Sequence, residues 1–206
     1  MNRECILVLV DAGLSNPDIT LQLLADDLSE ALEVYERIFA SDTVPARPFP
    51  LQTIMLSHES LPLPPDSSRP VRLYALSCTD NPDPTKAAEA LTQLREQCNN
   101  KGVAWQGGAA LPGGRLVAPC ANGPRMGRMR RSQSETIDRL ILAMRCGCSL
   151  SDLLANEQAL AEHNPRTRKP CNTDTDIIVA RCPVPFCIYN QVATFYESKR
   201  ISRHES

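Results

Sequence analysis

Two short apolar runs, each followed by a turn and then an amphipathic stretch, constrain the fold of this chain most. CILVLV at 5–10 leads into DAGLSNPD, and VRLYALS at 71–77 leads into CTDNPDP. The first run is continuous and rich in β-branched residues, as buried strands are, and the apolar and β-branched content of the second also predicts a strand. Apolar residues spaced three and four apart then predict helices over 19–39 and 85–98. The order strand, loop, helix, strand predicts βαβ units and a mainly parallel sheet covered by helices.

Weaker patterns extend this order along the chain. Asp18 is placed to cap the first helix, and Gly102 is placed to end the second. The remaining predicted elements are strands at 52–57, 103–111 and 176–180 and helices at 134–146 and 149–161.

Prolines divide the chain. Its 17 prolines exceed the usual share of about 5%, and many fall between residues 45 and 70. Proline removes a backbone donor and biases the preceding residue away from helix. We therefore predict one α/β domain over 1–163 with an irregular segment at 40–70, followed by a peripheral or partly disordered tail at 164–206.

Composition excludes several classes of protein. A net charge of -2 with 42% hydrophobic and 22% charged residues is that of an ordinary globular protein. The basic cluster RMGRMRR at 125–131 can attract phosphate or form an exposed helix entry, but no aromatic residues interleave with it. The apolar run before Asp11 is too short for a signal peptide or a membrane span. We expect a cytoplasmic protein without nucleic-acid or membrane partners.

The nine cysteines are odd in number and irregular in spacing, which indicates reduced thiols rather than a disulfide framework. Cys146 and Cys148 flank a glycine, and Cys182 precedes Cys187, but neither pair has the spacing of a zinc ribbon. We expect no metal site, and a cysteine-based metal or redox protein stays a third interpretation.

Three loops are candidates for a binding site, because ligands of parallel sheets bind beyond the carboxyl ends of the strands. In the first, at 11–20, Ser15, Asn16 and Thr20 can hold a phosphate at a helix start or merely cap an ordinary helix. In the second, at 78–84, the backbone, Thr79 and Asn81 can face a flat ligand or form a plain turn.

The third loop lies in WQGGAALPGGRLV at 105–117, which holds four of the nine glycines. The pairs Gly107–Gly108 and Gly113–Gly114 allow positive φ or close backbone approach. They indicate either a ligand-facing loop or a bulge followed by a tight turn. We expect them mainly to let a neighbouring helix or subunit pack close.

Residues 69–154 resemble the second half of flavodoxin-like NAD(P)H-dependent FMN reductases, most specifically from Gly102 to Gly114. The first strand and its loop are similar to the family's first strand and phosphate loop, although Asp11-Ala12-Gly13-Leu14 replaces the usual Gly-Ser-Pro-Arg type sequence. The resemblance implies a flavodoxin-like sheet, which looks shortened because no second strand and helix is recognised between Phe39 and Asp42.

The resemblance also implies a cofactor, FMN, with NAD(P)H as hydride donor to flavin N5 and no side chain acting as acid or base. The implied phosphate contacts are Ser15, Asn16 and Thr20. The implied ring contacts are Thr43, Val44, Pro45, Ala46, Cys78, Thr79, Asp80 and Asn81.

Two functions therefore stay open. The first is an FMN-dependent NAD(P)H oxidoreductase that passes electrons to a small-molecule or flavin substrate. The second is a non-catalytic flavodoxin-like relic or interaction module without bound flavin. Homo-oligomerisation is a further prediction, since a shortened sheet leaves edges to cover.

Overall fold

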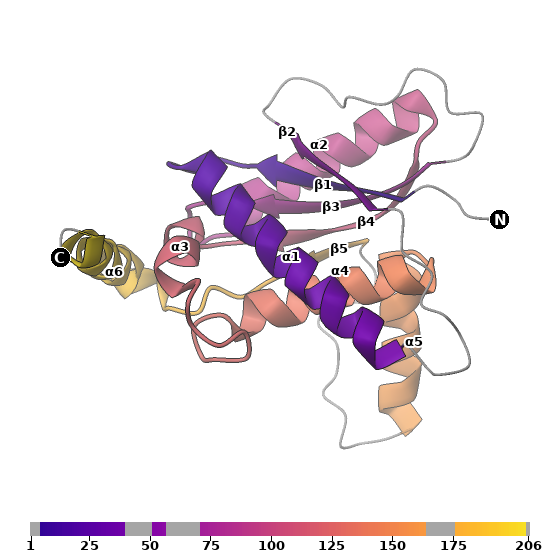
Figure 1. Ribbon diagram of the computed structural model, residues 1–206. Coiled ribbons are helices and arrows are strands. Elements are labelled where there is room, and N and C mark those ends of the chain that lie inside the picture. The colour runs from indigo at the N-terminus through magenta and orange to yellow at the C-terminus, as the bar shows by residue number, and fades with distance from the viewer. Residues whose placement is uncertain (1–4, 40–50, 57–70, 164–175, 205–206) are drawn as a thin grey trace.

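The computed structural model describes residues 5–39, 51–56, 71–163 and 176–204, which form a parallel sheet with helices on both faces (Figure 1). The strands are β1 (Cys5–Asp11), β2 (Leu51–Leu56), β3 (Arg72–Cys78), β4 (Ala104–Leu111) and β5 (Ile177–Val179). The helices are α1 (Pro17–Phe39), α2 (Thr85–Lys101), α3 (Val117–Cys120), α4 (Arg131–Cys146), α5 (Leu150–His163) and α6 (Tyr189–His204), with 3-10 turns η1 (Gly114–Leu116) and η2 (Phe186–Ile188). The predicted α/β class is confirmed.

The strand order is β2-β1-β3-β4-β5, and every neighbouring pair is parallel. This is the order of flavodoxin-like sheets. The second strand is present, paired in register with β1 from Cys5 opposite Leu51, and it lies where 52–57 was predicted. The described sheet therefore has five strands, and residues 57–70 between β2 and β3 lie outside the described residues.

Alternating residues of the strands build two separate cores. Leu7 and Leu9 of β1 and Leu76 of β3 face α1, α4 and α5. Ile6 and Val8 of β1 face α2 instead. Since each central strand is buried on both faces, its sequence reads as one apolar run, which is why these strands were predictable.

The connections between strands do not all have the same hand. The steps from β3 to β4 and from β4 to β5 run in the same direction across the sheet. However, α2 covers one face, while α4 and α5 lie on the other face beside α1 (Figure 1). The β4–β5 connection is therefore left-handed, whereas the β1–β2 and β3–β4 connections are right-handed, as about 98% of such crossovers are.

The first glycine pair lies at a bulge in β4. Leu73 is opposite Trp105 and Tyr74 is opposite Gly107, so Gln106 is the extra residue. Gly107 has φ 129°, and a Cβ there would lie 2.5 Å from Cβ of Leu150 in α5. The expectation that glycines let a helix pack close is confirmed here.

The C-terminal part of the chain adds a strand and a helix to the domain. Its residues 176–204 contribute β5 to the sheet and form η2 and the 16-residue helix α6. Tyr189 and Ala193 of α6 are buried in a small core with Leu116 and Cys120. Helix α6 packs beside α3 at the edge of the molecule (Figure 1). Helix α6 was not among the elements predicted from the sequence.

Candidate functional site

The carboxyl ends of β1 and β3 are neighbours in the sheet, so the loops that follow them meet. The Asp80 amide donates to the Gly13 carbonyl at 3.3 Å, and the Ala12 amide donates to the Cys78 carbonyl at 2.9 Å. The first two candidate loops are thus brought together, as ligand-binding loops of this fold are. The expected residues Thr43, Val44, Pro45 and Ala46 lie outside the described residues.

The carboxylate of Asp11 binds backbone amides of its own loop, the first candidate loop. Its Oδ1 accepts hydrogen bonds from the amides of Gly13 and Leu14, each at 2.8 Å. These amides follow the strand directly and precede α1, which is where a phosphate loop offers its donors. Here a side chain of the same loop already satisfies them.

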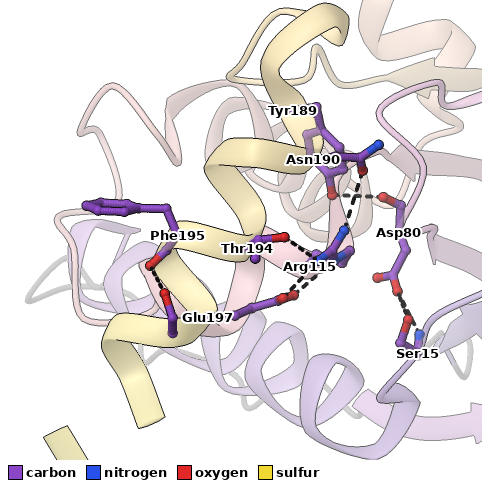
Figure 2. A network of polar contacts seen from close by, with 9 residues as sticks. Ser15, Asp80, Arg115, Tyr189, Asn190, Thr194, Phe195 and Glu197 are labelled. Carbon is purple, nitrogen blue, oxygen red and sulfur yellow. Dashed lines mark hydrogen bonds and ion pairs between the residues drawn. The ribbon is translucent and has the colours of Figure 1, made fainter. Parts of the chain in front are cut away.

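Asp80 from the second loop completes this arrangement. Its Oδ2 accepts from the Ser15 amide at 2.7 Å and from the Ser15 hydroxyl at 2.5 Å, and Figure 2 shows the two side chains pointing toward each other. Three consecutive amides, at residues 13 to 15, therefore donate to carboxylates. The predicted phosphate ligand Ser15 is paired with an internal anion.

The start of α1 differs from the prediction in one respect. The helix begins at Pro17, so Asp18 lies in its first turn and is not the capping residue. Proline suits this first position because its missing amide hydrogen would be unpaired there. Asn16 is exposed at the entry of the helix, and its carbonyl accepts from the amide of buried Thr20 at 3.1 Å.

The predicted ring contacts of the second loop are only partly accessible. Cys78 and Thr79 are buried, and Asn81 is exposed. Burial raises the pKa of the Cys78 thiol far above its usual range, and the carboxylates of Asp80 and Asp11 raise it further. The thiol of Cys78 is thus a neutral core group, not a surface that a flavin can touch.

The second glycine pair fixes the second loop. The Gly113 amide donates to the Asn81 carbonyl at 2.9 Å, and the Gly114 amide donates to the Thr79 carbonyl at 2.8 Å. A Cβ on Gly114 would lie 2.7 Å from Oδ1 of Asp80. The glycines at 113 and 114 therefore bind this loop to the end of β4, so their role here is packing.

The C-terminal helix also reaches this site. The hydroxyl of buried Tyr189 donates to the backbone carbonyl of Asp80 at 2.8 Å (Figure 2). Arg115 anchors the same helix through two hydrogen bonds to Glu197, at 2.9 and 2.8 Å. Neither Tyr189 nor Arg115 was predicted, although the spacing of Tyr189, Ala193 and Tyr196 is helical and was a signal for α6.

Two arginines of the basic cluster at 125–131 have a structural role. Arg125 and Arg130 both pair with buried Asp27 of α1, at 2.9 and 3.0 Å. Arg125 also pairs with Asp138 of α4 at 2.9 Å. These two arginines hold the segment before α4 against α1 and are not available to a phosphate.

A groove of about 460 Å³ lies on the other face of the sheet. It is lined by α2 and by exposed Val179 of the edge strand β5, and its lining residues are Pro84, Thr85, Ala88, Glu89, Thr92, Gln93 and Val179. A right-handed β4–β5 crossover would place its helix on this face. None of the predicted site residues lines the groove.

Within the described residues, no helix is long and apolar enough to cross a membrane. The same part of the chain holds no group of three or more histidine, cysteine or acidic side chains placed to bind a metal ion.

Comparison with protein-family models, with curated proteins and with solved structures finds no match. The resemblance to FMN reductases therefore stays a prediction. Only the fold and the contacts described above bear on function.

Proposed function

We propose that this protein is a flavodoxin-like interaction module that binds no flavin phosphate in the loop after β1. The observation that carries the proposal is the pairing of the amides of Gly13, Leu14 and Ser15 with the carboxylates of Asp11 and Asp80. A phosphate would have to displace both acceptors from the donors that it needs.

Charge adds to this competition. At 4 Å, two like unit charges repel by about 1 kcal/mol in water and by about 4 kcal/mol near a protein surface. A phosphate in the loop would carry its negative charge toward Asp11 and Asp80 together. The two carboxylates therefore disfavour an anion at the site, whereas a phosphate loop favours one.

The exposed apolar residues of the C-terminal segment support an interaction role. Phe186 is 63% exposed and Phe195 is 53% exposed, with Ile188 between them in the sequence. Exposed apolar patches mark protein interaction sites, and these three side chains offer apolar surface to a partner. A homo-oligomer remains part of this proposal, and light scattering during gel filtration measures it.

Flavin titration tests the proposal. At high protein concentration the wild type should leave the fluorescence and absorption of FMN unchanged, and added FMN should not start NAD(P)H oxidation. Asp80→Ala frees the Ser15 amide and removes one negative charge, so it should bind FMN more tightly than the wild type. Asp83→Ala, which removes an exposed carboxylate bonded within its own turn, is the matched control. Saturable quenching of FMN by the wild type would refute the proposal.

An FMN-dependent NAD(P)H oxidoreductase is the second candidate. It is favoured by the strand order and by the meeting of the loops after β1 and β3, which is where flavodoxin-like sheets hold their cofactor. In such an enzyme the flavin supplies the redox chemistry, and Ser15, Asn16 and Thr20 would hold its phosphate. Flavin that copurifies with the protein and supports turnover would select this candidate.

A further inference from the structure

The segment Cys146-Gly147-Cys148 lies at the opposite end of the molecule, between α4 and α5. Gly147 ends α4 in the left-handed conformation, with φ 64° and ψ 29°. Its amide donates to the Met144 carbonyl at 3.1 Å, and the Cys148 amide donates to the Ala143 carbonyl at 3.1 Å. The turn between the two cysteines is therefore a hydrogen-bonded helix cap with one defined shape.

Two side chains of β3 hold the backbone of this segment. Arg72 donates to the Gly147 carbonyl, and the Tyr74 hydroxyl donates to the Cys148 carbonyl at 2.8 Å. Both contacts use backbone oxygens. The thiols themselves are not used in this way: Cys146 is exposed and Cys148 is half-buried.

The cap brings the Cα atoms of the two cysteines within the range that disulfides span. A residue in helical conformation of either hand holds the Cα atoms of its two neighbours about 5.4 Å apart, as the helix radius and rise require. Disulfides join Cα atoms that lie about 4.4 to 6.8 Å apart. The left-handed Gly147 therefore sets a spacing that a disulfide between Cys146 and Cys148 needs.

We propose that Cys146 and Cys148 form a dithiol site that low-molecular-weight disulfides oxidise to an internal disulfide. The Cys146 thiolate attacks one sulfur of the small disulfide, whose S–S bond breaks and releases one thiolate. Cys148 then loses its proton and attacks the Cys146 sulfur, which releases the second thiolate. The protein dithiol loses two electrons, the small disulfide gains them, and the two thiol protons end on the two released thiols.

Exposure and environment set the order of these steps. Cys146 is open to solvent, so it meets the small disulfide first. The Cys148 sulfur lies 3.8 Å from the Ala143 carbonyl, and burial, followed by the neighbouring Cys146, raises the pKa of its thiol. Cys148 is thus the resolving thiol, and ring closure moves it away from the cap of α4. An exposed pair closed into so small a ring forms a reducible disulfide, as expected of a regulatory site.

Mass spectrometry after treatment of the native full-length protein with oxidised glutathione tests the proposal. Trypsin releases residues 146–166, a peptide that contains only these two cysteines. After blocking of free thiols, this peptide should lack two hydrogen atoms and carry no blocking group, and dithiothreitol should reverse the change. The peptide 182–199, with Cys182 and Cys187 five residues apart, is the internal control and should carry glutathione or blocked thiols instead.

Three variants decide the outcome. Cys148→Ser should leave Cys146 as a stable glutathione adduct, and Cys146→Ser should leave Cys148 largely unmodified. Gly147→Ala strains the left-handed turn and should slow ring closure several-fold in protein that retains its circular dichroism spectrum. A wild-type peptide with two blocked thiols, or with glutathione on Cys146 and no internal disulfide, would overturn the proposal.

Discussion

The two ends of the parallel sheet satisfy the backbone groups of their loops with opposite chemistry. At the carboxyl end, carboxylates of Asp11 and Asp80 accept from the amides that precede α1. At the amino end, Arg72 and Tyr74 donate to the carbonyls that follow α4. Both sets of backbone groups lie in loops beside the helices, where donors and acceptors also need partners, so each loop receives the side chain that it lacks.

The two ends of the sheet differ in which groups remain free to bind or react. The carboxylates at the carboxyl end occupy the donors that a phosphate would use, so capping and ligand binding compete there. Arg72 and Tyr74 use only backbone oxygens, so the capping of α4 leaves the exposed thiol of Cys146 free to react. Pairing of backbone groups therefore occupies the phosphate donors at one end of the sheet, whereas at the other end it leaves a thiol exposed.

The largest expected effect is at the amino end. Gly147→Ala should lower the free energy of unfolding by about 3 kcal/mol, because it adds left-handed strain and the loss of a charged hydrogen bond. The new Cβ would lie 2.6 Å from Nη1 of Arg72. Denaturant unfolding measures the change.

Gly102→Ala is the matched control for this substitution. Gly102 also ends a helix, with φ 67°, but nothing lies within 4 Å of its added Cβ. Its cost should be only about 1 kcal/mol, from the backbone alone. Equal costs for the two variants would show that Arg72 contributes nothing to the cap.

The matching test at the carboxyl end is Gly114→Ala. Its Cβ would lie 2.4 Å from Cδ2 of Leu14 and 2.7 Å from Oδ1 of Asp80. We expect a loss of about 2 kcal/mol in the free energy of unfolding, within the usual range for overpacking. Faster hydrogen exchange at the Ser15 amide would show that the carboxylate has moved, and unchanged exchange would contradict the close packing of the two loops.

The sequence predicted the fold well where burial leaves a local pattern. CILVLV and VRLYALS were recognisable because both faces of β1 and β3 are buried. The helices predicted at 19–39, 85–98, 134–146 and 149–161 have boundaries within three residues of those observed.

The site was less predictable, because its contacts join distant parts of the chain. Ser15 and Asp80 are 65 residues apart, and Tyr189 is 109 residues from Asp80. Only the strand order makes them neighbours. The sequence marked Ser15 and Asp80 as separate flavin contacts, but no local pattern predicts that they bind each other. The left-handed β4–β5 connection likewise could not be predicted from the spacing of apolar residues.

The buried thiol of Cys5, at the amino end of the sheet, should make the stability of the fold depend on alkaline pH. Burial raises the pKa of Cys5 from 9.0 to about 12. Above pH 9 the unfolded chain loses this proton while the folded chain keeps it, so stability falls up to about pH 12, by on the order of 1 kcal/mol per pH unit. Cys5→Ala should reduce the slope of the unfolding free energy against pH. Identical slopes for wild type and Cys5→Ala would contradict this assignment.

The smallest effect concerns the contact between α6 and the closed loop. Tyr189→Phe removes the hydrogen bond to the Asp80 carbonyl and should cost about 1 kcal/mol. Because Arg115 still binds Glu197, α6 should stay docked, and amide exchange should rise at Asp80 and its neighbours more than in α6. Tyr196→Phe, in the same helix, is the control. Equal changes in amide exchange in both variants would mean that Tyr189 supports α6 by packing alone. The carboxylates of Asp11 and Asp80 would then hold the two loops without a contribution from α6.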